Sequence, residues 1–150
     1  MKNVTKYVVG FMFDATGSKV SVIRKNRPSW QHGLINGIGG HVEKGESSLS
    51  AVAREFKEES GVETIKNNWK KFCSMRGTNN DKSSFPLDFF YTVGDVSSLR
   101  TMTDEEVIVA DVKELCSGSQ KTVGNIPWLV ALARDFVFGC HPPMSVVVVY

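Results

Sequence analysis

Apolar and polar residues alternate along the chain in short segments that predict β-strands separated by turns. Residues 7–13 (YVVGFMF) form an apolar run rich in β-branched and aromatic side chains, and residues 19–25 (KVSVIRK) alternate valines with polar residues. Two such segments joined by the short DATG turn predict a β-hairpin. The same criteria predict further strands over residues 69–75, 86–93, 107–112 and 145–150.

A glycine-rich segment precedes a helical pattern. Residues 34–46 (LINGIGGHVEKGE) contain four glycines, which predicts a loop whose backbone turns sharply or approaches another group closely. Apolar residues then recur at helical spacing, so we expect a helix that begins at an N-cap, Ser47 or Ser48, and ends at Gly61. Its apolar stripe consists of Leu49, Val52, Ala53 and Phe56.

Strands mixed with helices predict a layered α/β domain. A second helix is expected over residues 125–138. The polar segment 76–84 (RGTNNDKSS) either closes over a substrate or joins two strands. A chain of 150 residues is long enough to bury a sizeable core, so we expect one domain spanning residues 1–150.

Charge and cysteine content exclude several classes of protein. A net charge of +2 is too close to neutral to predict a stable nucleic-acid complex. The three cysteines, Cys73, Cys116 and Cys140, form no C-x-x-C pair, which argues against a disulfide framework or a zinc site. Neither a signal peptide nor a membrane span is predicted. We expect a soluble cytoplasmic protein, monomeric or homodimeric, with no membrane partner.

Three carboxylates crowd one part of the predicted helix. Glu55, Glu58 and Glu59 lie within roughly 100° of one another around the helix axis, beside the apolar stripe. Their mutual repulsion costs a few tenths of a kcal/mol per pair. Salt bridges from Arg54, Lys57 or distant basic residues can offset this cost on a solvated face. Alternatively, the cluster binds a hard divalent cation, which prefers oxygen ligands.

The cluster ends a longer pattern. Residues 40–62 (GHVEKGESSLSAVAREFKEESGV) resemble the Nudix box, GX5EX7REUXEEXGU, where U is a bulky apolar residue. The match includes every constrained position, with the aromatic Phe56 at a position where aliphatic residues are commoner. The resemblance implies a Nudix-type α/β/α sandwich with a mixed sheet between helices. It also implies hydrolysis of a nucleoside diphosphate linked to another moiety, with Mg²⁺ or Mn²⁺ as the cofactor and a nucleotide as the substrate.

The same resemblance assigns roles within the box. Its implied metal ligands are Glu55, Glu58 and Glu59, together with a backbone carbonyl of Gly39 or Gly40. Arg54 is expected to orient a neighbouring glutamate, and Glu46 to support the helix or the outer coordination shell.

A general base is harder to assign, because the family takes it from the box or from a later loop. Within the box the candidate is Glu55. The later segment TMTDEEV offers Asp104, Glu105 and Glu106, of which we select Glu105. An exposed acidic turn without a catalytic role is the alternative.

Two asparagines resemble residues of MutT-like nucleoside triphosphate pyrophosphatases. Asn36 precedes the glycine segment, and Asn125 lies in the pattern GNIPWLVAL. An amide can pair with a purine edge, including that of an oxidised purine, because it offers both an acceptor and donors. Asn125 is also a suitable helix N-cap, and the two roles are compatible.

Other substrate contacts are less specific. Arg24, Lys25 and Arg27 can hold phosphates, or form a solvated basic face. Trp30 can stack on a base, or pack against its own domain, and His41 can contact a ligand or cover the helix. The proline and tyrosine markers of ADP-ribose and diadenosine polyphosphate hydrolases are absent from residues 77–80.

We therefore expect a nucleoside triphosphate pyrophosphatase that releases a nucleoside monophosphate and pyrophosphate. Hydrolysis of ADP-ribose, a nucleotide sugar, a dinucleoside polyphosphate or an RNA cap is the alternative within the family. A Nudix domain that senses a nucleotide without cleaving it is the alternative of another class.

Overall fold

The computed structural model describes residues 4–139 and 146–149, which contain eight strands, three α-helices and three short 3₁₀ helices. The strands are β1 (Tyr7–Phe13), β2 (Lys19–Arg24), β3 (Ile35–Asn36), β4 (Ile38–His41), β5 (Lys70–Thr78), β6 (Ser84–Val93), β7 (Glu106–Asp111) and β8 (Val146–Val149). The helices are α1 (Ser48–Ser60), α2 (Val112–Ser117) and α3 (Ile126–Phe138).

The strands form one mixed sheet of order β3-β2-β1-β6-β5-β8, with β4 paired to β1 and β7 paired to β2. Two pairs, β1 with β6 and β5 with β8, are parallel, and the other pairs are antiparallel. The strands β1 and β2 do form an antiparallel pair, but only around Phe13 and Val20. Beyond that point they diverge, because β4 pairs with β1 and β7 pairs along the whole of β2.

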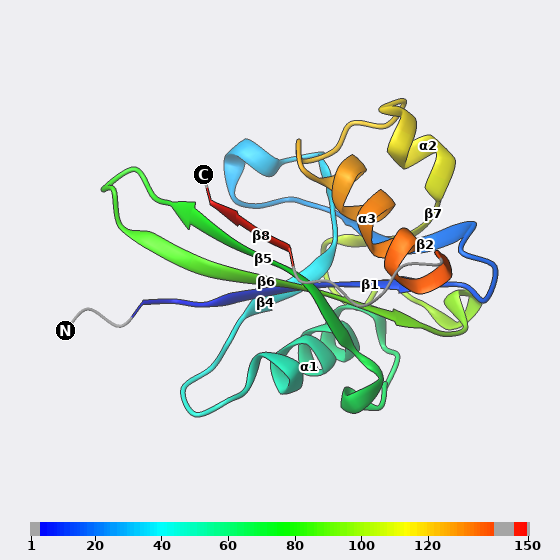
Figure 1. The fold of residues 1–150 in the computed structure, drawn as a ribbon, viewed down its shortest axis with the longest axis horizontal. Helices are drawn as coiled ribbons and strands as arrows, with labels where there is room; N and C mark the ends of the chain where they lie inside the picture. Colours follow the sequence, from blue (N-terminus) through cyan, green and yellow to red (C-terminus); the bar gives the residue numbers. More distant parts are fainter. Residues whose placement is uncertain (1–3, 140–145, 150) are drawn as a thin grey trace.

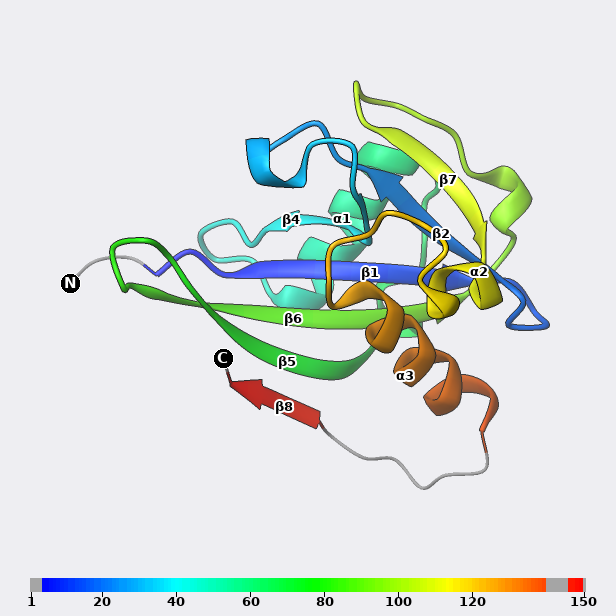
Figure 2. The ribbon, with the colours of Figure 1, turned by 90° about the horizontal axis from the view of Figure 1, so that it is seen from above.

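Helices cover both faces of this sheet, which confirms the predicted α/β/α sandwich. Helix α1 lies on one face, and α2 and α3 lie on the other (Figures 1 and 2). Each layer has its own apolar core: Val52 and Phe56 of α1 pack with Trp69 and Ile38, whereas Leu129 of α3 packs in the other cluster. The Phe56 and Trp69 rings meet edge to face with centroids 5.0 Å apart, which fixes α1 on its face of the sheet.

Local sequence patterns determine both ends of α1. The Ser47 hydroxyl accepts a hydrogen bond of 3.1 Å from the Ser50 backbone N–H, so Ser47 is the N-cap. Gly61 ends the helix in the left-handed conformation, at φ 73°, as predicted from its position before Val62.

The glycine-rich segment 34–46 is not the loop that we predicted, because it contains the short strands β3 and β4. The glycines are needed there for close approach. A Cβ at Gly39 would collide with the carbonyl oxygen of Val8, and one at Gly40 would collide with the carboxylate of Glu55. Because these two glycines have no side chain, β4 can pack closely between β1 and the acidic side of α1.

Three further outcomes concern the second half of the chain. The sequence pattern missed the short helix α2. Segment 76–84 joins two strands, since β5 ends at Thr78, β6 begins at Ser84 and a turn lies between them. Asn125 precedes α3, yet its side chain makes no capping hydrogen bond. Cys140 and the ends of the predicted terminal strand, Ser145 and Tyr150, lie outside the described residues.

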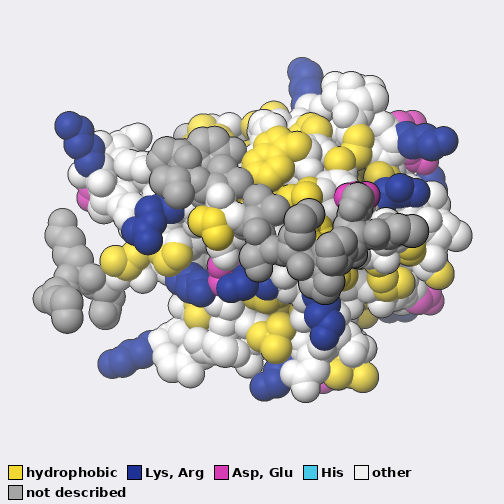
Figure 3. Space-filling view, viewed as in Figure 1, with side chains coloured by type: hydrophobic (Ala, Val, Ile, Leu, Met, Phe, Trp, Pro, Cys, Tyr) yellow, Lys and Arg dark blue, Asp and Glu magenta, His cyan; other side chains and the backbone are white. Residues whose placement is uncertain are grey.

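Surface properties agree with the modest net charge. On the face drawn in Figure 3, Lys and Arg side chains are scattered among apolar and uncharged atoms. Within residues 4–139 and 146–149, no helix has the length and apolar character that crossing a membrane requires.

Candidate active site

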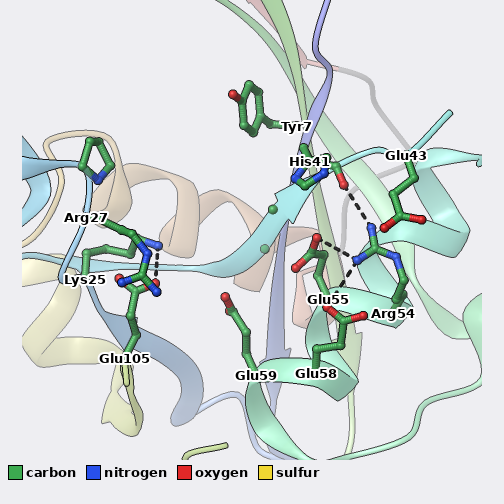
Figure 4. Close-up of a pocket in the computed structure, with 13 residues that line it drawn as sticks. Tyr7, Lys25, Arg27, His41, Glu43, Arg54, Glu55, Glu58, Glu59 and Glu105 are labelled. Atoms are coloured by element: carbon green, nitrogen blue, oxygen red, sulfur yellow. Dashed lines mark hydrogen bonds and ion pairs between the residues drawn. The ribbon is translucent and has the colours of Figure 1, made fainter. Parts of the chain in front are cut away.

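An open cleft of about 680 Å³ lies where α1 faces the edge of β4 and the end of β2. Most of the catalytic and metal-binding residues predicted from the sequence line it (Figure 4). Its lining comprises Tyr7, Lys25, Arg27, Pro28, Gly39, Gly40, His41, Glu43, Arg54, Glu55, Glu58, Glu59 and Glu105.

Arg54 organises one wall of the cleft. Its guanidinium donates two hydrogen bonds to the Glu46 carboxylate, at 2.9 and 3.0 Å, and one of 3.0 Å to the carbonyl of His41. It also donates to Glu55 at 2.9 Å and to Glu58 at 3.4 Å. These hydrogen bonds hold the pKa of Glu46 below its ordinary value. Glu46 therefore reaches the site through Arg54 and does not itself line the cleft.

Glu59 extends from α1 into the space between Glu105 and Glu55 (Figure 4). Its Oε2 is buried and accepts no hydrogen bond from the described residues. Burial is the main cause that raises the pKa of Glu59 to about 7; the nearby carboxylates of Glu55 and Glu105 act in the same direction, whereas the ammonium of Lys25 and a hydrogen bond with the backbone of Gly39 oppose them. The helix thus presents a carboxylate that is costly to ionise without a cation.

The opposite wall is built by the pairing of β2 with β7. The antiparallel register sets Arg24 against Glu106, so the next residues outward, Lys25 and Glu105, also face each other. The Lys25 ammonium donates to Glu105 Oε1 at 2.7 Å, and the backbone N–H of Asn26 donates to Glu105 Oε2 at 2.6 Å. Burial alone would raise the pKa of Glu105, but these hydrogen bonds hold it below its ordinary value.

Oxygen ligands of the cleft have the chemistry that Mg²⁺ or Mn²⁺ requires. Among the described residues, however, no three His, Cys, Asp or Glu side chains are arranged to hold a metal ion. Two of the three glutamates are paired with Arg54, Glu55 at 2.9 Å and Glu58 at 3.4 Å. The carboxylate oxygens, including the unpaired buried Oε2 of Glu59, are the donor type that a divalent cation prefers. Metal binding by these three glutamates and Gly40 stays a prediction.

Four predicted substrate-binding residues lie outside the cleft lining. Arg24 is turned away because alternate residues of a strand face opposite sides, and it contacts Glu106 and the carbonyl of Gly33. Trp30 is 66% exposed. Asn36 donates to Gln31 and accepts from the Gly37 N–H.

Asn125 is the fourth of these residues. Its Nδ2 lies 3.9 Å from the sulfur of Met75, and its buried Oδ1 has no partner among the described residues. The segments that carry Asn36 and Asn125 lie side by side, since Ile35 forms a parallel bridge with Thr122 and accepts a hydrogen bond from Val123.

Three residues of the cleft lining were not predicted from the sequence: Tyr7, Pro28 and Glu43. Tyr7 pairs with His41 across β1 and β4, and its ring packs edge to face against Phe85 at 5.4 Å. No local pattern distinguishes this tyrosine from the rest of an apolar strand. Only the long-range pairing of β4 with β1 brings it to the cleft.

Comparisons with known proteins agree with this architecture. The family model described as NUDIX domain matches residues 4–122. No curated protein sequence matches the chain.

Solved structures with a similar fold share little sequence with the chain. The mutator MutT protein of Bacillus halodurans has a TM-score of 0.70 at 19% identity, over 98% of this chain and 90% of that one. The NUDIX domain of Shewanella oneidensis NrtR, solved with ADP ribose, has a TM-score of 0.75 at 14% identity, over 91% and 90%. A Caenorhabditis elegans Ap4A hydrolase has a TM-score of 0.62 at 14% identity, over 89% and 99%. At these identities the likeness concerns the fold.

Proposed function

Because the chain belongs to the Nudix family of pyrophosphohydrolases, we propose that it hydrolyses a nucleoside triphosphate to the monophosphate and pyrophosphate, in a MutT-like reaction. The observation that carries the proposal is the cleft itself. Three glutamates of α1 line one wall, and Lys25 and Arg27 line the other. A chain of phosphates with bound cations would satisfy both walls.

In this proposal the residues of the cleft have different roles. Glu55, Glu58 and Glu59 would hold the ion or ions together with the carbonyl of Gly40. When bound, Mg²⁺ or Mn²⁺ supplies charge neutralisation at the phosphoryl oxygens and makes an attacking water more nucleophilic. Lys25 and Arg27 would bind the phosphates, and Arg54 would orient Glu55 and Glu58 from its anchor on Glu46. Glu55 and Glu105 are the two candidates for the proton acceptor.

Two features support a purine nucleotide as the substrate. Asn36 and Asn125 lie on adjacent segments, and the buried Oδ1 of Asn125 has no partner among the described residues. A buried amide oxygen without a hydrogen bond is unfavourable, and a donor on a base edge would satisfy it. With a rotation of the amide, the same side chain can instead donate to an acceptor on that edge, such as the oxidised position of a damaged purine.

The alternatives use the same catalytic wall and differ in the leaving group. Relatives of this fold include the NrtR domain solved with ADP ribose and an Ap4A hydrolase. A domain that only senses nucleotide would not require every glutamate of the box, and all of them are present here.

A substrate panel tests the proposal. The protein is incubated, with Mg²⁺ and with Mn²⁺, with dGTP, its 8-oxo form, dATP, ADP-ribose, diadenosine tetraphosphate, UDP-glucose and a capped RNA, and the products are separated by chromatography. We expect a monophosphate and pyrophosphate from a purine triphosphate. A marked preference for ADP-ribose, yielding AMP and ribose 5-phosphate, would overturn the triphosphate assignment. Nucleotide binding without turnover of any panel member would favour the sensing domain.

A further inference from the structure

The Lys25–Glu105 pair is the most enclosed charged contact of the cleft. The two side chains are only 17% and 5% exposed, and their charged atoms are 2.7 Å apart. The second carboxylate oxygen of Glu105 accepts a 2.6 Å hydrogen bond from the backbone N–H of Asn26. Each oxygen of Glu105 thus already has a strong donor, and little of the side chain reaches the solvent.

Such an arrangement is poorly suited to a general base. A general base needs a lone pair within hydrogen-bond reach of the proton that it removes. For Glu105, a water or substrate would have to approach a carboxylate enclosed by Lys25 and by the backbone of Asn26.

Lys25 is in a different position from its partner. An ammonium has three donors, and the contact with Glu105 takes one of them. Lys25 lines the cleft opposite the α1 glutamates, so the remaining donors belong to the wall that faces a bound polyphosphate. A lysine on a flexible four-carbon stem gains most from a fixed partner, because the partner removes rotamer freedom before binding.

Neighbouring hydrogen bonds join the residues that follow β2 to the turn before β7. The Asn26 side chain donates to the Asp104 carbonyl at 2.6 Å, and the Arg27 guanidinium donates to both Asp104 oxygens, at 2.8 and 2.9 Å. Glu105 is the buried centre of this set, whereas the Arg27–Asp104 pair is exposed, with side chains 65% and 59% accessible.

We propose that Glu105 is a positioning residue that acts through Lys25: it holds the Lys25 ammonium and the backbone of residues 25–27 in place to receive the substrate's phosphates. The inference rests on the proposed function, since a nucleotide polyphosphate is the anion that Lys25 would bind. It assigns the proton acceptor to another group of the cleft and removes Glu105 from that role.

A kinetic cycle of Glu105→Gln, Lys25→Met and the double variant tests this inference. Gln retains the shape and an acceptor for the Asn26 N–H but loses the charge that holds Lys25. We expect Glu105→Gln to raise KM for the nucleotide about 3- to 30-fold, to lower kcat less than about 10-fold, and to keep the acidic limb of the pH–rate profile. The double variant should be no worse than Lys25→Met, because both changes remove one function.

Two results would overturn the inference. One is a fall of about a thousandfold in kcat of Glu105→Gln with unchanged KM and loss of the acidic limb, as expected of a general base. The other is a double variant whose loss equals the product of the two single losses. Lys19→Met is the matched control, because it breaks the exposed Lys19–Asp111 pair at the other end of the same two strands. It should leave both parameters unchanged.

A binding measurement keeps this test separate from the proposed function. Calorimetric titration with inorganic tripolyphosphate in the presence of Mn²⁺ requires no turnover. If the wild-type protein cleaves no triphosphate but binds tripolyphosphate, and both single variants weaken binding about equally, the proposed substrate fails and the positioning role stands. The positioning role fails if Lys25→Met weakens tripolyphosphate binding and Glu105→Gln does not. The melting temperature of Glu105→Gln shows that this variant is folded.

Discussion

Glu59 offers a sharp test of how the acidic wall is stabilised, because its buried Oε2 accepts no hydrogen bond from the described residues. Its pKa is raised from an ordinary 4.5 to about 7, mainly by burial. Folded protein therefore binds a proton that the unfolded chain releases between these two pH values. The free energy of unfolding should fall as pH rises from 4.5 to 7 and stay low above 7. Each pH unit of this interval is worth about 1.4 kcal/mol, so the full penalty approaches about 3 kcal/mol.

Glu59→Gln removes this titration while keeping the side chain's shape. In EDTA at pH 8, the variant should unfold with up to about 3 kcal/mol more free energy than the wild type, which corresponds to a melting temperature roughly 6 to 12 °C higher for a chain of this size. At pH 4.5 the two proteins should melt nearly together. Urea unfolding followed by circular dichroism, repeated across pH 4.5 to 8, measures the difference directly.

The matched control is Glu58→Gln, because that side chain is 58% exposed on the same helix. Its effect on metal-free stability should stay within about 0.5 kcal/mol. With Mg²⁺ added, the wild type should become more stable than Glu59→Gln, since an ion held by Glu59 stabilises only the wild type to the full extent. A Glu59→Gln variant that is no more stable than the wild type in EDTA at pH 8 would refute the claim that burial makes this carboxylate costly to ionise.

Four further predictions address the cleft and the nucleotide. Glu58→Gln should abolish hydrolysis while leaving the circular dichroism spectrum unchanged, and near-full turnover would remove Glu58 from the metal ligands. Gly39→Ala should destabilise the fold by about 1 to 3 kcal/mol in chemical unfolding, because its Cβ meets the Val8 backbone. Gly40→Ala should mainly lower activity, because its Cβ would displace the Glu55 carboxylate from the position in which Arg54 holds it. Asn125→Ala should reduce the preference among bases about 10-fold or more in kcat/KM without weakening tripolyphosphate binding, and an equal loss on every substrate would contradict base recognition. Tyr7→Ala should raise KM for nucleotides several-fold and Tyr7→Phe should not, if the ring lining the cleft stacks on the substrate.

Sequence alone predicted the features of the site that depend on near neighbours. Ser47, Phe56 and Gly61 follow local rules for the start, the buried face and the end of a helix, and the structure confirms all three. The clustering of Glu55 and Glu59 on one side of that helix follows from its period, because a helix repeats every 3.6 residues. For such residues the sequence separation and the spatial separation are linked by known geometry.

Features that depend on strand pairing were not predictable in the same way. Alternation along residues 19–25 indicated a strand but could not indicate that its main partner would be β7 rather than β1. That pairing is what turns Lys25 toward Glu105 and Arg24 away from the cleft. The same limit applies to Tyr7, which reaches the cleft through a register with His41 that no local pattern contains. The unpartnered Oδ1 of Asn125 likewise depends on which side chains surround it, and a cap-like sequence position could not reveal that.

Arg54 explains how the acidic wall can exist without a cation and still accept one. The guanidinium holds Glu46 with two hydrogen bonds and Glu55 with one, and these side chains are 24%, 16% and 11% exposed. Its contact with Glu58 is longer, 3.4 Å, and Glu58 is largely exposed, so that pair contributes at most about 1 kcal/mol.

An arriving cation therefore competes for Glu58 at little cost, while Arg54 stays anchored on Glu46. The buried Oε2 of Glu59 is already available, because it has no hydrogen-bond partner among the described residues. The two carboxylates most available to an ion thus flank Glu55, whose position against Gly40 is fixed by Arg54. Arg54→Lys keeps the charge but cannot bridge Glu46 and Glu55 with the same geometry, so it should weaken Mn²⁺ binding in calorimetry more than Lys57→Gln does on the exposed face of the same helix. Equal binding by the two variants would show that the anchor is dispensable.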